Sequence, residues 1–411
     1  MLINLAWRNL WRRKRRTLIT AFSVAGGILL STVFTGSGDY TYTNIIETSA
    51  AMGFGHITVE AEGYNDTPSL HKRISGVEDI RRALLATPQV TAAAVRVTGM
   101  AMFASAAKSV GGVFFGLDPA VETPEINMYL RAITKGGLPA DPSSRDLVVG
   151  EKMAEKLKIK IGRKLVYTVT DVNGEIVSEV GRVAGIFRTG VEEVDGAVCL
   201  IPIGRARSVV KYAPDEASLV AVFIKDQRKV NHVRAELEAR TLKPGMEILT
   251  WQKTQSDVNG LIEVDRKSNY VSQLFVGLLI AAGVLNTLFM SVLERKREFG
   301  IMMAVGLAPG RLFALVILES LYIALTGLVM GVIITSPVFY LLYHYGLDLR
   351  SFVEDGYAIG SVLVDPVLKV RLFRESAVMI LCGVFGLTIL AGLYPAWKAG
   401  RENPVDSIKT I

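Results

Sequence analysis

The sequence has few of the residues that build disulfides and metal centres. Its 411 residues include two cysteines, Cys199 and Cys382, and four histidines. Cys199 falls in a stretch of mixed polarity and Cys382 in an apolar window, so we expect no disulfide between them. The histidines are scattered without metal-ligand spacing. We therefore predict no metal site and no catalytic centre built on these residues.

Motifs of nucleotide and hydrolase chemistry are also missing from the sequence. No G-x-x-x-x-G-K-[ST] segment occurs, and the nearest cluster, Gly162-Arg163-Lys164, has neither the loop nor the hydroxyl. No G-x-S-x-G elbow is found either. We expect this chain not to be an enzyme, to have no catalytic residues and to bind no cofactor of its own.

Charged residues make up 21% of the chain, yet they avoid four long windows. A helix that spans a bilayer needs about 20 apolar residues. Residues 17–38, 268–293 and 376–397 carry no charge, and the window 312–343 carries only Glu319. We predict four transmembrane helices over these ranges. Glu319 is expected to reach the headgroup zone or to face a partner helix.

The net charge of +7 is concentrated beside these windows. This placement favours anionic membrane lipids over nucleic acid as the partner. Lysines and arginines are frequent in residues 1–16, in the loop 294–311 and in the tail 398–411, so we predict that all three segments and both termini are cytoplasmic. Residues 1–16 are expected to form an amphipathic segment at the membrane interface. A signal peptide is the alternative for the start of the chain, but its apolar run is long for one.

The longest segment without a spanning window, residues 39–267, mixes strand and helix patterns. We predict an α+β domain inserted between the first and second transmembrane helices, with a short loop, 344–375, on the same side of the membrane. An outer βα subdomain over about 39–90 and 205–260 is expected to hold an inserted, β-rich subdomain over about 90–205. Predicted strands cover 56–61, 90–103, 110–117, 164–170, 176–187, 197–203, 219–224 and 246–251, and predicted helices cover 77–87, 151–157 and 229–239. Asn173-Gly174 is a strong hairpin signal.

The cytoplasmic loop 294–311 is amphipathic at helical spacing and breaks at Gly306 and at Pro309-Gly310. We predict that its charged end and an apolar patch form a contact surface. One interpretation is an anchor to lipid headgroups, and the other is a short helix that docks in a groove of a cytoplasmic partner. The residues assigned to this surface are Glu294, Arg295, Lys296, Arg297, Glu298, Phe299, Gly300, Met302, Met303, Gly306 and Leu307.

One face of the first predicted span carries small and hydroxyl side chains at steps of three or four residues. They are Thr20, Ser23, Gly27, Ser31 and Thr35. Such a face serves close helix packing, or it lines a pocket for acyl chains together with the second span. Asn286 in the second span is costly in lipid and is expected to face protein.

Two long segments resemble the permease core of FtsX/MacB-type ABC transporters. They are Asn286-Thr-Leu-Phe-Met-Ser-Val-Leu-Glu-Arg-Lys-Arg-Glu-Phe-Gly-Ile-Met-Met-Ala-Val-Gly306 followed by Leu318-Glu-Ser320, and Tyr394-Pro-Ala-Trp-Lys-Ala-Gly-Arg-Glu-Asn-Pro-Val-Asp-Ser-Ile-Lys409. Four weaker segments are similar to the lipoprotein-releasing subgroup: Gly53-Phe-Gly-His-Ile-Thr-Val59, Gly116-Leu-Asp-Pro119, Val149-Gly-Glu-Lys-Met-Ala-Glu-Lys-Leu157 and Ala184-Gly-Ile-Phe-Arg-Thr-Gly-Val-Glu-Glu-Val-Asp195. Phe299 departs from the isoleucine or leucine usual in the family. The fused ATPase of MacB-type exporters is not found in this sequence.

The resemblance implies a multi-pass protein of the bacterial inner membrane with its large domain in the periplasm. It implies that the loop 294–311 is the coupling helix that receives a cytoplasmic ABC ATPase dimer, which binds the ATP and magnesium. A second permease subunit, identical or a paralogue, is expected beside this one. The implied function is extraction of lipoproteins or similar amphiphiles by mechanotransmission. A transducer that regulates a periplasmic hydrolase and an exporter of peptides or small molecules with an adaptor protein are the alternatives.

Overall fold

The computed structural model describes residues 2–12, 14–241, 243–348, 358–359, 362–363 and 367–401. The predictions for Arg13, for the tail beyond residue 401 and for most of residues 349–366 lie outside this range. The chain divides into two compact units. The membrane unit comprises Met1–Thr41, Val264–Leu349 and Val367–Ile411, and the globular unit comprises Tyr42–Glu263 and Arg350–Pro366.

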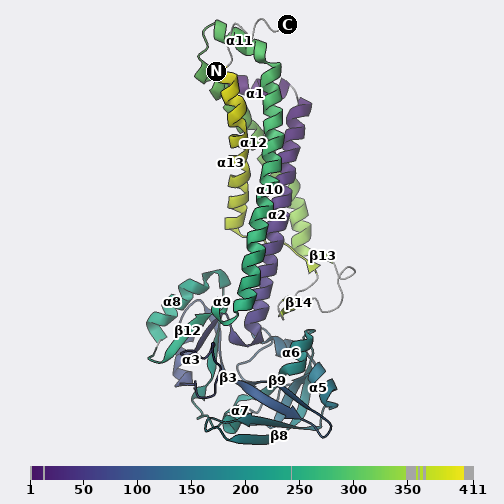
Figure 1. The fold of residues 1–411 in the computed structure, drawn as a ribbon, viewed down its shortest axis with the longest axis vertical. Helices are drawn as coiled ribbons and strands as arrows, with labels where there is room; N and C mark the ends of the chain where they lie inside the picture. Colours follow the sequence, from purple (N-terminus) through teal and green to yellow (C-terminus); the bar gives the residue numbers. More distant parts are fainter. Residues whose placement is uncertain are drawn as a thin grey trace. The chain divides into compact units, whose positions relative to one another are not determined.

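Long helices dominate the membrane unit (Figure 1). They are α1 (Leu2–Arg12), α2 (Lys14–Ser49), α10 (Ser256–Glu294), α11 (Lys296–Ala304), α12 (Pro309–His344) and α13 (Arg374–Gly400). Within the described residues, four of them (α2, α10, α12 and α13) are long and apolar enough to cross a membrane. This confirms the four predicted spans. Each helix is longer than its apolar window, and the end of α2 and the beginning of α10 are part of the globular unit.

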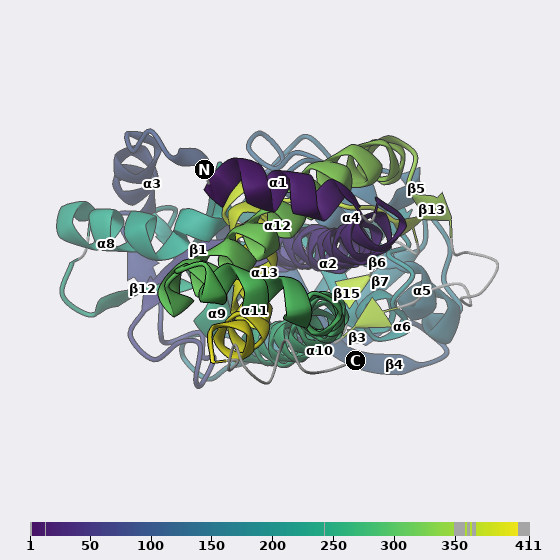
Figure 2. The same cartoon turned by 90° about the horizontal axis from the view of Figure 1, so that it is seen from above.

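Small residues let the helices of this unit approach one another closely. A Cβ on Gly327 would lie 2.6 Å from Val24 Cγ1, and one on Gly331 would lie 2.6 Å from Ile28 Cδ1. These contacts bring α12 against α2. Seen from above, α1 lies against α12 (Figure 2), where the rings of Trp7 and Tyr322 meet edge to face at 5.2 Å. Close backbone approach supplies the dispersion contacts that hold helices together in a lipid solvent, where the hydrophobic effect does not drive association.

The globular unit is built on a ten-stranded sheet with the order β12-β1-β11-β3-β4-β9-β6-β8-β5, and β7 pairs with β3 and β8. The strands of this sheet are β1 (Ile57–Ala61), β3 (Val90–Ala104), β4 (Ser109–Leu117), β5 (Ile133–Gly136), β6 (Asp146–Gly150), β7 (Lys164–Thr170), β8 (Ile176–Phe187), β9 (Val198–Pro202), β11 (Leu219–Ile224) and β12 (Met246–Thr250). The β4–β9 and β6–β8 pairs are parallel and the others antiparallel. Short pairs join β2 (Ile74–Ser75) to β10 (Glu216–Ala217), β13 (Leu347–Asp348) to β16 (Val367–Leu368), and β14 (Ala358–Ile359) to β15 (Val362–Leu363).

Short helices connect these strands. They are η1 (Ala50–Phe54), α3 (Val77–Leu85), α4 (Met128–Arg131), α5 (Glu151–Leu157), α6 (Glu192–Ala197), α7 (Ile203–Val210), η2 (Gln227–Lys229), α8 (Val230–Thr241) and α9 (Trp251–Thr254). All eight predicted strands and all three predicted helices of this domain are confirmed within a few residues. The turn at Gly174, where φ is 80°, joins β7 and β8 as predicted.

Strand β3 is shared by two parts of the sheet. Its first half pairs with β11 through Arg96, and its second half pairs with β4 from Val97 onward. A long strand common to both parts gives them one continuous hydrogen-bonded sheet. The predicted division into two subdomains therefore has no clean boundary near residue 90, and it stays a prediction.

Candidate coupling site

Helix α11 is set off from its neighbours by the break that the sequence predicts. Gly306 adopts the left-handed φ of 101°, and its N–H donates to the Met303 carbonyl at 3.0 Å while that of Leu307 donates to Met302 at 3.0 Å. A glycine in this conformation ends helices because it has no Cβ to clash. Pro309 then begins α12 at a position where its missing N–H costs nothing.

The predicted apolar patch of α11 faces the helix bundle and not the surface. Phe299 is buried in a cluster with Leu312, Leu315 and Val316 of α12, and Gly300 is buried as well. Met302 and Leu307 pack at the edge of the same cluster. Phe299 is therefore not a surface residue, because α11 turns its more apolar edge toward the bundle.

Two large apolar side chains that were not predicted are exposed on α11 and at its C-cap. Ile301 is 50% exposed, and Val305, at the end of the helix, is 85% exposed. They are four residues apart, so they lie on one face of the helix. Arg297 is exposed, and Lys296 and Met303 are half-buried. A partner of α11 would meet Ile301 and Val305 first.

Arg295, directly before α11, ties the loop to the third spanning helix. Its Nη1 lies 2.7 Å from Glu319 Oε1 and its Nε lies 3.1 Å from Glu298 Oε2. The guanidinium also stands 4.9 Å from the centre of the Phe299 ring. Glu319 is buried on α12 and accepts a second bond, at 3.1 Å, from Asn9 Nδ2 of α1. The prediction that Glu319 faces a partner helix describes this arrangement.

Basic residues of the N-terminal segment complete the network. Arg12 lies 3.1 Å from Glu298, and Arg16 Nη1 lies 3.1 Å from Glu294. Burial raises the pKa of Glu298, but the neighbouring Arg295 and Arg12 lower it by a larger amount. The pKa of Glu298 therefore lies below its usual range. These groups line a small polar pocket of about 130 Å³. Four residues of this pocket were not predicted as part of the site: Asn9, Arg12, Arg16 and Glu319. Two features of the sequence pointed to them, the single acid in the window 312–343 and the basic cluster before the first window.

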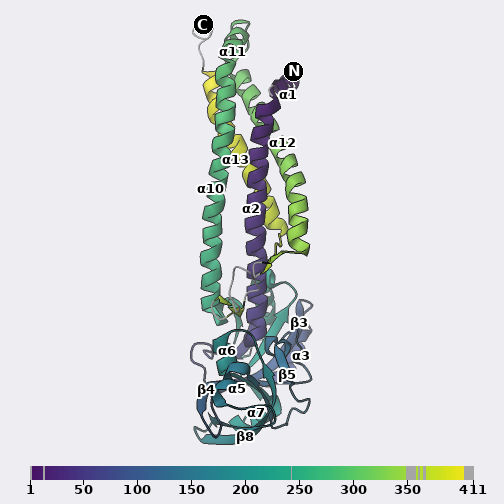
Figure 3. The ribbon, with the colours of Figure 1, turned by 90° about the vertical axis from the view of Figure 1, so that its right-hand side faces the viewer.

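The small-residue face of α2 packs on α10, and the two helices lie side by side (Figure 3). Thr20 Oγ1 donates to Thr287 Oγ1 at 2.8 Å, and Gln273 Nε2 donates to Thr35 Oγ1. Between them, a Cβ on Gly27 would lie 2.1 Å from Ile280 Cδ1. Three contacts along one stripe favour the helix-packing interpretation of this face.

Two residues of the predicted packing face lie elsewhere. Ser23 and Asn286 are exposed on the surface of this chain, while Thr20, Gly27, Ser31 and Thr35 are buried. Asn286 is not covered by the described residues of this chain, so the expectation that it faces protein stays a prediction for a neighbouring chain. Helical spacing indicates which residues share a face, but it does not reveal which face a neighbouring helix covers.

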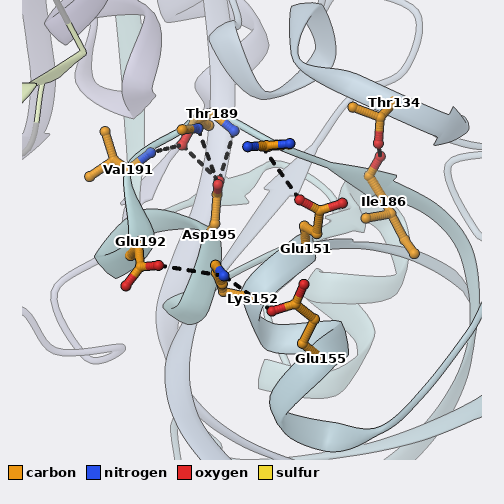
Figure 4. A network of polar contacts seen from close by, with 11 residues as sticks. Thr134, Glu151, Lys152, Glu155, Ile186, Thr189, Val191, Glu192 and Asp195 are labelled. Carbon is orange, nitrogen blue, oxygen red and sulfur yellow. Dashed lines mark hydrogen bonds and ion pairs between the residues drawn. The ribbon is translucent and has the colours of Figure 1, made fainter. Parts of the chain in front are cut away.

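In the globular unit, two of the family-like segments pack on each other (Figure 4). The buried carboxylate of Asp195 accepts bonds from Thr189 N, Thr189 Oγ1 and Gly190 N, at 2.8, 2.7 and 3.1 Å. A Cβ on Gly150 would lie 2.2 Å from the Asp195 carbonyl oxygen, so only glycine fits there. Lys152 lies between Glu155 and Glu192, at 3.2 and 3.4 Å. These contacts join α5 to α6, and α6 to the loop that precedes it.

Comparisons with known families match both units. The family described as the FtsX-like permease C-terminal matches residues 271–404, and that described as the MacB-like periplasmic core domain matches residues 17–240, more than half of the chain. The chain belongs to the FtsX/MacB family of ABC transporter permeases. Helix α11 of this FtsX/MacB-type permease lies in the FtsX-like part, and the ten-stranded sheet lies mostly in the MacB-like part.

Individual relatives are distant but cover much of the permease. The lipoprotein-releasing system transmembrane protein LolC of Neisseria meningitidis is 20% identical over 325 residues, 78% of each chain. An uncharacterized ABC transporter permease of Methanocaldococcus jannaschii is 23% identical and covers 99% of this chain and 97% of its own. The macrolide export ATP-binding/permease protein MacB 1 of Yersinia pestis is 22% identical over 98% of this chain and 60% of its own.

Proposed function

We propose that this permease works by mechanotransmission with a separate cytoplasmic ABC ATPase dimer, which docks on α11. The observation that carries the proposal is the attachment of α11 to the bundle. Phe299 anchors the helix in the α12 core, and Arg295 joins it to buried Glu319. A push on the exposed residues Ile301 and Val305 would reach α12 through these contacts, and it would reach α1 through the Arg12–Glu298 pair.

The proposed topology follows the distribution of basic residues. Helix α1, the start of α2 and the α11 loop would be cytoplasmic, with the globular unit in the periplasm and the spans in the bacterial inner membrane. Ile3 and Trp7 are exposed on α1 beside Arg8 and Arg12, which suits a helix lying on anionic lipid headgroups. Within the globular unit, the two parts of the sheet on either side of β3 would act as the two subdomains.

A second permease subunit, identical or a paralogue, is part of the proposal. Asn286 is exposed in the last quarter of α10, within the uncharged window 268–293. An amide exposed to hydrocarbon is unfavourable. A neighbouring permease helix would satisfy it.

The proposed cargo is a lipoprotein or a similar amphiphile, taken from the outer leaflet of the inner membrane. The similarity to LolC, named for lipoprotein release, supports this class, and it covers 78% of the chain. Each subunit has four spans, and α2, α10 and α12 are closely packed. This arrangement is better suited to transmitting movement than to forming a wide channel.

The test is reconstitution of the permease with its ABC ATPase in liposomes that carry an acylated lipoprotein. We expect the lipoprotein to stimulate ATP hydrolysis and to leave the membrane for a soluble acceptor. The same lipoprotein with its acylated cysteine changed to serine is the control and should do neither. Absence of both stimulation and release with the acylated form would overturn the cargo assignment, and a periplasmic hydrolase or an adaptor would then be tested as the missing partner.

A further inference from the structure

The globular unit contains a cavity of about 860 Å³. None of the described residues that line it belongs to the ion-pair network around Arg295 and Glu319. It lies where the end of α2 and the beginning of α10 meet strands β3 and β4 and helix α6. Ser49 ends α2, and Thr254 to Val258 lead into α10. Pockets of about 300 to 1,000 Å³ hold small molecules in proteins. The volume therefore fits one compact ligand.

The walls of the cavity are mainly apolar. Met100 of β3 is 76% exposed, an unusual fraction for a large apolar side chain in a sheet. Phe115, Val194 and Val198 are buried beneath the surface of the cavity. Apolar pockets of this kind are typical binding sites for small molecules. The apolar side chains of the lining include Met52, Met100, Val113, Phe115, Val194 and Val198.

Apart from the imidazole of His71, the ionisable groups of the lining are acidic. The lining includes three carboxylates, Asp171, Glu193 and Asp257, and no lysine or arginine. Lys211 already pairs with Asp171 at 2.7 Å. Glu193 and Asp257 are exposed and make no ion pair among the described residues. A cleft lined by one sign of charge concentrates ligands of the opposite sign.

We propose that this cavity binds a cationic amphiphile, with its apolar part against Met100 and Phe115 and its positive group beside Glu193 and Asp257. An anionic acyl lipid is disfavoured by the same carboxylates. The site is next to a contact between the end of α2 and the residue that precedes α10, because Gln255 Nε2 donates to the Ser49 carbonyl at 3.0 Å. A ligand there touches the end of α2 and the beginning of α10 together, so its binding stabilises one arrangement of these two ends.

The test uses the full permease in nanodiscs without any ATPase, so its outcome does not depend on the lipoprotein assignment. The probe is an alkyl-trimethylammonium that carries a benzophenone, and its anionic counterpart is the matching alkyl sulfonate. After photolysis, peptide mapping should find saturable labelling by the ammonium probe near Val113–Phe115 and Val194–Val198, and none by the sulfonate.

Variants distinguish labelling inside the cavity from non-specific adsorption of the probe. Met100→Trp places bulk in the cavity and should abolish the saturable labelling, whereas Met102→Trp, two residues along the same strand and outside the lining, should leave it unchanged. Glu193→Gln with Asp257→Asn should weaken labelling about fivefold, and Glu78→Gln with Asp79→Asn on α3 is the matched surface control. Labelling confined to the membrane helices, labelling that survives Met100→Trp, or equal labelling by both probes would overturn the proposal.

Discussion

Arg295 and Glu319 meet at 2.7 Å, with the arginine directly before helix α11 and the glutamate buried on α12. Removing one partner of a buried pair leaves the other charge unsatisfied, which costs about 3 kcal/mol. We expect Arg295→Ala to lower the melting temperature of the detergent-solubilised permease by several degrees. Arg295→Ala with Glu319→Ala should cost less than the sum of the single changes. Arg297→Ala, on the exposed side, is the control and should change little. Additive effects of the two single changes would contradict the pairing.

The two exposed apolar residues of α11 should matter for coupling and not for folding. We expect Ile301→Asp with Val305→Asp to reduce permease-dependent ATP hydrolysis at least about tenfold, since a few apolar contacts carry most of an interface's energy. Thermal stability should stay within about 0.5 kcal/mol of the parent. Phe299→Ala should instead lower the free energy of unfolding by about 3 kcal/mol, because it leaves a cavity in the bundle. An unchanged ATPase rate in the double variant would argue against docking on this face.

Gly27 sets the distance between α2 and α10. A leucine there would collide with Ile280, so Gly27→Leu should destabilise the bundle by about 2 kcal/mol. Gly26→Leu is a matched control, because nothing lies within 4 Å of a Cβ at that position. Ile280→Ala should partly rescue the Gly27 variant in thermal melts. If the Gly26 and Gly27 variants melted alike, the proposed contact would not limit helix approach.

Glu60 makes the globular unit sensitive to pH. Burial, with a smaller contribution from Glu247 directly opposite on β12, raises the pKa of Glu60 to about 7. The folded state therefore favours the protonated form. Its contribution to stability is fully present below about pH 4.5 and is lost as the pH rises through about 7.

The Glu60→Gln variant isolates this effect. We expect it to gain up to about 3 kcal/mol over the parent between pH 5 and pH 8, measured by denaturant unfolding of the full permease. Glu62→Gln, an exposed neighbour, should show no such gain. A constant difference between Glu60→Gln and the parent at both pH values would show that Glu60 does not titrate in this range.

The sequence was most informative where one periodicity ran over many residues. The four spans and long strands such as β3 and β8 follow from uncharged runs and alternation. The short helices α4 and α6 were missed because four and six residues cover too few turns to show an apolar stripe. Helix α11 was predicted, but its buried side was misjudged. Phe299 shows why: a helical pattern gives relative directions around the axis, and the neighbours that bury one side come from helices distant in sequence.

Local chemistry also explains part of the family likeness. Gly150 and Asp195 belong to two segments that suggested the lipoprotein-releasing subgroup, and they touch in the fold. The contact supports the fold of the sheet and does not by itself indicate a cargo. The cargo is encoded elsewhere, in surfaces that sequence pattern alone does not distinguish.

The stripe between α2 and α10 limits how these helices can move. A hydrogen bond closes it near each end, Thr20 with Thr287 and Thr35 with Gln273, and Gly27 interlocks with Ile280 between them. Axial sliding of one helix past the other would break all three contacts at once, whereas tilting the pair as a unit breaks none. The two helices therefore cannot slide along each other, but they can tilt together. A force applied at one end of the pair would change the tilt of the other end.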